Sequence, residues 1–229
     1  MALLKKFFNK KESYPMYLYT EKELNEYEAH VAKHFGEFKE VFHEILSPDV
    51  HLDVIIIEPT EEEPYYKLIT EGAGAYRQNA PKEYVDSKGH YAEYMIFLPA
   101  DWNIKSSEKC FYWPISELKK IARLPIDCDT WLGIGHTVHS NERMEQIDES
   151  TKLNSFMILC GLDNEAQRCE LRLKSGKLIN FYLLMPLYQE ELDYKLNNGY
   201  EAFMNLIPDE DLPPIVNPNR TNYAGSTNQ

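Results

Sequence analysis

The sequence predicts one α+β domain, in which helices flank a mixed, mainly antiparallel sheet. Strand-length runs rich in β-branched and aromatic residues are separated by stretches whose apolar residues recur every three or four positions. No internal repeat and no clear linker divides the 229 residues, of which 43% are hydrophobic. The chain is therefore long and apolar enough to bury a single core.

The first expected element is a helix over residues 20–46. Thr20 and Glu23 have the spacing of a capping box, in which each side chain accepts a hydrogen bond from a backbone N–H at the helix start. Apolar residues then recur at spacings of three and four as far as Ile45, and Ser47-Pro48 ends the pattern.

Three strands are expected next, over residues 50–58, 65–71 and 93–98. Their β-branched and aromatic residues are typical of buried strands, and Pro59 and Pro99 close two of them. Residues 72–90 contain three glycines and one proline and are expected to be irregular.

A second helix is expected from Trp113-Pro114 to Pro125, because proline suits the first turn of a helix and stops a helix already formed. A long loop over residues 130–148 should follow. Further strands are expected over residues 155–160, 169–173 and 178–185, the last two joined as a hairpin at Ser175-Gly176.

The last elements are a helix that starts at Pro186 and ends at Asn198-Gly199, and a short helix over residues 200–207. The proline-rich segment after residue 208 is expected to wrap the surface or to fray.

Charge and apolar patterning limit the classes of function. The formal net charge is −13, from 37 acidic and 24 basic residues, so the field of the protein repels phosphate backbones and attracts basic proteins. A nucleic-acid partner is not expected, although the charge also serves solubility. The sequence shows no signal-peptide pattern and no apolar run of membrane-spanning length, which predicts a cytoplasmic protein with no membrane partner.

No catalytic, cofactor-binding or metal-binding residue is predicted, because each pattern fails on spacing or context. His136 and His139 lack the helix and the glutamate of a zinc-protease motif. His51 and Asp53 share one face of a strand, where a structural hydrogen bond is the simpler interpretation than a catalytic pair.

Several segments, in order, resemble one family, the Suppressor of fused domain in its compact bacterial form. They read HLDV at residues 51–54, PYYKLITEG at 64–72, LPADW at 98–102, WPI at 113–115, DTWLG at 129–133, PLY at 186–188 and NPNR at 217–220. The resemblance implies a Suppressor of fused-like fold over residues 20–220, with an N-terminal segment over residues 1–19 and a flexible tail over residues 221–229.

The resemblance also implies that the chain binds a protein. Bacterial members look like immunity proteins that neutralise toxins by direct binding, and an acidic protein would suit a basic toxin domain. Animal members hold a transcription-factor peptide as an added strand, which makes a regulatory scaffold for a basic partner the first alternative. An enzyme with an unrecognised site, around His51 and Asp53 or around His136 and His139, is the second.

The expected partner-binding residues are Trp131, His136, Glu190 and Glu191. The two aromatic residues lie in the loop that carries part of the resemblance, and large aromatic side chains dominate many protein interfaces. The two glutamates form an acidic turn at a helix start, where they would also stabilise the helix dipole.

Overall fold

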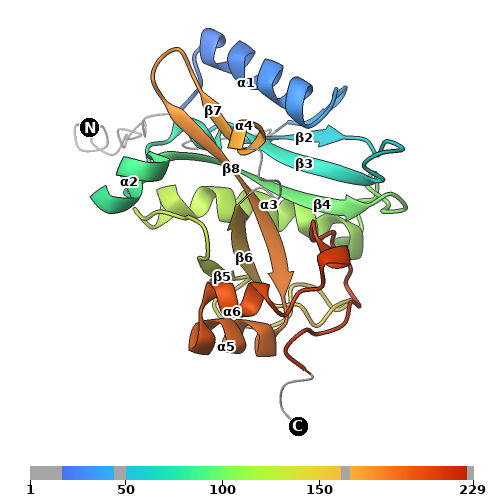
Figure 1. The fold of residues 1–229 in the computed structure, drawn as a ribbon. Coiled ribbons are helices and arrows are strands. Elements are labelled where there is room, and N and C mark those ends of the chain that lie inside the picture. Colours follow the sequence, from blue (N-terminus) through green and yellow to red (C-terminus); the bar gives the residue numbers. More distant parts are fainter. Residues whose placement is uncertain (1–16, 44–49, 161–165, 226–229) are drawn as a thin grey trace, which may run out of the picture.

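The structure, a computed structural model, describes residues 17–43, 50–160 and 166–225 (Figure 1). Its centre is an eight-stranded sheet in the order β1-β2-β3-β4-β8-β6-β5, with β7 paired to β8. The strands are β1 (Glu40–Phe42), β2 (Asp53–Ile57), β3 (Tyr65–Glu71), β4 (Tyr91–Pro99), β5 (Thr137–His139), β6 (Ser155–Cys160), β7 (Glu170–Arg172) and β8 (Leu178–Leu187).

The helices are α1 (Glu21–His34), α2 (Lys82–Lys88), α3 (Lys109–Asp127), α4 (Ala166–Cys169), α5 (Gln189–Asn198) and α6 (Tyr200–Met204), with single 3-10 turns η1 (Ala73–Ala75) and η2 (Asp209–Asp211). Among the described residues, no helix is both long enough and apolar enough to cross a membrane.

The predicted α+β class and the mixed, mainly antiparallel sheet are confirmed. Strand β8 is the centre of the sheet, because it pairs in parallel with β4 along one edge and antiparallel with β7 and then β6 along the other. The other neighbouring strands are antiparallel.

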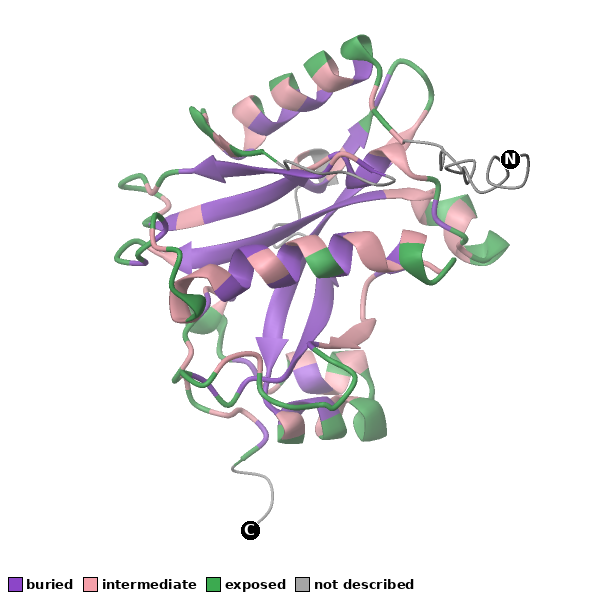
Figure 2. Cartoon of the chain, turned by 180° about the vertical axis from the view of Figure 1, so that it is seen from behind, coloured by how far each residue is buried: buried purple, intermediate pink, exposed green. Residues whose placement is uncertain are grey.

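Each face of the sheet has its own apolar core, because side chains alternate along a strand. Val54 and Ile56 of β2 pack with residues of α3, and Ile55 and Ile57 belong to the core that includes Tyr27 of α1. Residues of α5 and α6 belong to the same core as α1. In Figure 2, α3 crosses the buried strands on the opposite face of the sheet.

The first helix is shorter than predicted. It begins at the predicted capping box but ends at His34, with Phe35 as its C-cap, and Gly36 then adopts a φ of +125°. The chain turns there into β1, which pairs with β2. Phe38, which packs on the core, and Phe42, which is exposed, continue the apolar spacing, so spacing alone suggested an uninterrupted helix. The predicted stop at Ser47-Pro48 lies outside the described residues.

The prediction that Pro114 and Pro186 start helices is wrong. Helix α3 begins at Lys109, so Pro114 lies inside the helix, and Pro125 lies in its last turn. Pro186 belongs to β8, which continues to Leu187, and α5 starts only at Gln189.

Several short elements were not predicted, α2 and β5 among them. Helix α2 lies within residues 72–90 and contains no buried residue, and β5 lies within the predicted loop 130–148. The strands over residues 65–71 and 155–160 and the β7–β8 hairpin are confirmed.

The predicted domain limits at residues 20 and 220 stay a prediction. Beyond the second limit, the backbone N–H of Tyr223 donates to Glu191 and Ala224 is buried, while residues 226–229 lie outside the described part.

Candidate partner-binding surface

Strand β5 is the last strand at one end of the sheet. The loop that contains Trp131 and His136 leads into it. A β-bulge sets the start of the strand: the Gly135 N–H donates to the Ile158 carbonyl at 2.8 Å, and the Ile158 N–H donates to the His136 carbonyl at 2.9 Å. Gly135 and His136 thus both lie opposite the single residue Ile158. Gly135 has the positive φ, +79°, that this type of bulge requires. The bulge fixes where β5 begins.

The outer edge of β5 offers backbone groups to a partner. Antiparallel bonds to one neighbour involve alternate residues. His136 bonds to Ile158, and the Ser140 N–H donates to the Asn154 carbonyl at 3.0 Å, so the backbone of Thr137 and His139 points away from β6. No other described strand pairs with this edge. It is therefore a free edge onto which an extended peptide could add.

Trp131 and His136 lie together at one end of this edge. Their ring centroids are 4.2 Å apart, and the Tyr84 ring also packs against Trp131, with its centroid at 4.4 Å. Burial and the charge of Lys195 lower the pKa of His136, so its imidazole is neutral at pH 7. The pair forms a half-buried aromatic corner with no net charge.

An acidic loop follows the other end of β5. Residues 141–150 contain four acidic residues and one arginine, and most of them are exposed. The Asn154 side chain ties this loop to α5, because its Nδ2 donates to the Met144 carbonyl at 3.4 Å and to Gln189 Oε1 at 2.6 Å. Negative charge thus extends from the end of β5 toward the start of α5.

Glu190 and Glu191 occupy different environments. Glu190 is exposed and accepts a hydrogen bond from Asn222. Glu191 has no exposed surface; its oxygens accept hydrogen bonds from Arg220 at 2.5 Å and from the backbone N–H groups of Tyr188 and Tyr223 at 2.9 Å. Glu191 therefore holds the C-terminal segment, and only Glu190 presents its carboxylate to solvent.

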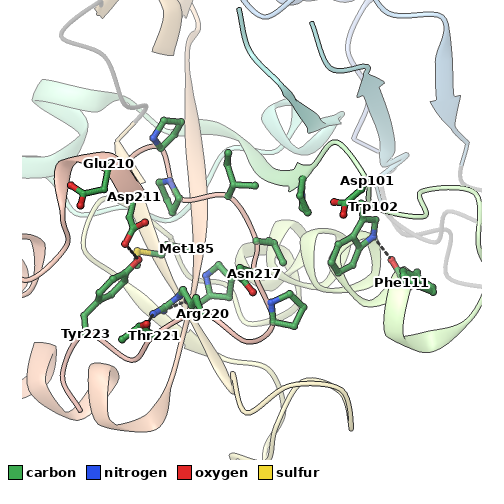
Figure 3. A pocket seen from close by; sticks show the side chains of 17 residues that line it. Asp101, Trp102, Phe111, Met185, Glu210, Asp211, Asn217, Arg220, Thr221 and Tyr223 are labelled. Carbon is green, nitrogen blue, oxygen red and sulfur yellow. Dashed lines mark hydrogen bonds between the residues drawn. The ribbon is translucent and has the colours of Figure 1, made fainter. Parts of the chain in front are cut away.

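A cavity of about 710 Å³, which was not predicted, lies beside this C-terminal segment (Figure 3). Pro213, Pro214, Pro218 and Trp102 are among the residues that line it. Arg220 and Tyr223 also line it, and both donate hydrogen bonds to the buried Glu191. The excess of proline in this segment was the one sequence signal.

A buried carboxylate on the central strand β4 organises the turn after β3. Glu93 is fully buried and accepts hydrogen bonds from the hydroxyls of Tyr19 and Thr70 and from the N–H groups of Gly72 and Gly74. Burial raises the pKa of Glu93 to about 7, although these hydrogen bonds lower it. Two of the donors are backbone N–H groups just after β3, so Glu93 holds that turn in place.

The two histidine pairs considered from the sequence differ in the structure. His51 Nε2 lies 3.2 Å from Asp53 Oδ2, which confirms the predicted hydrogen bond. His136 and His139 belong to no group of three potential metal ligands among the described residues, and the buried Nδ1 of His139 has no partner there.

Comparison with known proteins identifies the relatives of this chain. Residues 48–221 match the family model described as Suppressor of fused protein (SUFU). An uncharacterized protein of Ureaplasma parvum serovar 3 is 23% identical over 194 residues, which cover 82% of this chain and 90% of the relative.

Two solved structures share the fold. A putative SUFU homolog from Neisseria gonorrhoeae is 17% identical, with a TM-score of 0.61 over 87% of this chain and 96% of the homolog. A chain of the Sufu-Fu complex is 13% identical, with a TM-score of 0.62 over 87% of this chain and 91% of its own length.

Proposed function

Because the chain belongs to the Suppressor of fused family, we propose that it is a non-enzymatic module that binds another protein along β5 and the acidic loop. The free backbone edge of Thr137 and His139 is the observation that carries this proposal. The solved complex of a structural relative with Fu supports a protein as the class of ligand.

The partner that suits this surface best is a basic toxin domain, which makes the chain an immunity protein of the cytoplasm. The net charge of −13 would steer a basic protein toward it, and the acidic loop and Glu190 place exposed carboxylates between the end of β5 and the start of α5. Trp131 and His136 would supply the apolar anchor, whereas Glu191 would act only by holding the segment that contains Arg220.

A second candidate function, a regulatory scaffold that takes a peptide as an added strand, is favoured by the same free edge. In strand addition, main-chain hydrogen bonds provide much of the affinity. The two functions make different demands, because toxin capture depends mainly on charge and strand addition mainly on the backbone of β5.

Two variants test strand addition and charge separately. The first is Thr137→Pro, which removes an outward-facing N–H without removing a bond to β6, with Thr137→Val as its control. The second is the charge reversal Glu142→Lys/Glu145→Lys, with Glu61→Lys/Glu62→Lys, in the exposed turn before β3, as a control of equal charge change.

The wild-type protein and the variants are used to capture partners from extracts of the native cell, and the captured protein is then purified. Affinity is measured by calorimetry at two salt concentrations, and neutralisation is measured as growth rescue when the partner is co-expressed. An immunity protein should rescue growth and lose at least about tenfold in affinity on charge reversal. A scaffold should instead lose affinity with Thr137→Pro and show no rescue.

Equal binding by the wild type, Thr137→Pro and the charge-reversed protein would contradict the proposed surface. Failure to recover any protein partner would contradict the function itself.

A further inference from the structure

Two histidines and an aspartate converge near the edge of the sheet opposite β5. His43 follows β1, His51 precedes β2, and Asp53 is the first residue of β2. Nδ1 of His43 lies 2.8 Å from Asp53 Oδ2, and Nε2 of His51 lies 3.2 Å from the same oxygen. All three potential ligand atoms lie within 4.8 Å of one another.

The register of the sheet creates this convergence. Phe42 pairs with Val54, so the next position along each strand brings His43 opposite Asp53. His51 and Asp53 are two residues apart in an extended chain and share a face. The three side chains thus come from both sides of the β1–β2 connection.

We propose that His43, His51 and Asp53 form a binding site for one divalent transition-metal ion of the zinc class. Two imidazole nitrogens and one carboxylate oxygen are a donor set that zinc uses, and tetrahedral zinc takes such ligands at about 2.0–2.2 Å. Ligands at that distance lie roughly 3.3 Å apart, close to the separations of both nitrogens from Asp53 Oδ2.

The aspartate of this site is buried, whereas the two histidines are accessible to solvent. The Asp53 side chain is 6% exposed and belongs to a buried strand, whereas those of His43 and His51 are 74% and 41% exposed. An ion can therefore reach the site from solvent and keep water in its fourth position. Metal binding would fasten β1, the outermost strand on this side, to β2.

The carboxyl group of Glu71 lies next to these three residues. Glu71 faces Asp53 across the β2–β3 pair, so the two side chains lie on one face of the sheet. The Oε2 atom of Glu71 is buried and has no hydrogen-bond partner among the described residues. A buried carboxyl oxygen beside the site therefore has no hydrogen bond within the described residues that would account for its burial.

Zinc binding to the full chain is measured by competition with a chromophoric chelator at pH 7.5, with His43→Ala and His51→Ala as test variants. His43 is well exposed, so its substitution should leave the fold intact, which circular dichroism checks. His34→Ala, at the end of α1, is the matched control.

The wild type and His34→Ala should bind one zinc ion per chain, and each test variant should bind at least about tenfold more weakly. Cobalt substitution should give a tetrahedral visible spectrum that His43→Ala lacks. Absence of stoichiometric zinc binding, or equal affinity in all four proteins, as expected if the free cysteines bind the ion, would overturn the proposal.

Discussion

The substitution Arg220→Ala should strongly destabilise the protein, because Arg220 is the cation paired with the buried Glu191. Both oxygens of Glu191 accept hydrogen bonds from the guanidinium at 2.5 Å, and the Glu191 side chain has no exposed surface. Arg220 also donates to the Pro186 carbonyl at 2.8 Å and lies over the rings of Tyr188 and Tyr223.

Removing one partner of a buried ion pair costs about 3–5 kcal/mol, because the other charge stays buried without compensation. After the substitution, the donors that Glu191 keeps in the described part of the chain are the backbone N–H groups of Tyr188 and Tyr223. In a domain of this size, each kcal/mol lowers the Tm by about 2–4 °C, so the expected decrease is about 6–20 °C.

Differential scanning calorimetry and urea unfolding measure this effect, with Arg143→Ala in the exposed acidic loop as the control. The double variant Glu191→Gln/Arg220→Met removes both charges and should recover about 2 kcal/mol relative to Arg220→Ala. A loss below about 1 kcal/mol for Arg220→Ala, or a double variant less stable than Arg220→Ala, would refute the assignment of this ion pair as the fastening of the C-terminal segment.

Further predictions concern pH and backbone geometry. Burial lowers the pKa of His30 from 6.5 to about 4, so the unfolded state takes up a proton first and up to about 3 kcal/mol of stability should be lost as the pH falls from 6.5 to 4. His30→Leu should lack this loss in urea titrations, and an unchanged pH slope would contradict it. The pKa of Glu23 is lowered to about 2, so a second loss should follow as the pH falls from 4.5 to 2, and Glu23→Gln should lack it. Gly72→Ala should cost at least about 3 kcal/mol in urea unfolding, since φ is +122° and its Cβ would lie 2.0 Å from the His51 carbonyl oxygen. Gly176→Ala, with φ at +92° and no atom within 4 Å of the new Cβ, should cost only about 1 kcal/mol; equal losses for the two would exclude the close approach as the cause.

Local sequence patterns predicted two kinds of element correctly. One kind is stabilised by contacts between residues close in sequence, and the other is a strand whose residues are all buried. The capping box at Thr20 and the strand of β-branched residues before Pro59 are such cases. The end of α1 could not be predicted, because Phe38 and Phe42 keep a helical spacing although Phe38 packs from an irregular turn and Phe42 belongs to β1. Burial depends on the direction of the backbone, which spacing alone does not determine.

The candidate surface was only partly accessible to sequence reasoning. The resemblance selected Trp131 and His136, and the structure brings their rings together. The free edge of β5 depends on a three-residue strand and a bulge at Gly135, which are too short for periodicity. The environment of Glu191 depends on Arg220, 29 residues away, and no local pattern indicates such a partner.

The place of β8 has a consequence for synthesis on the ribosome. Strands β1 to β4 emerge first and can pair in sequence, but the partner of β4 on its second side is encoded more than 80 residues later. A nascent chain that ends before residue 178 therefore leaves the backbone of Tyr91 to Met95 in β4 without its partner strand. Closure must await a pairing of high sequence separation, which favours slow folding and makes prematurely terminated chains prone to aggregate.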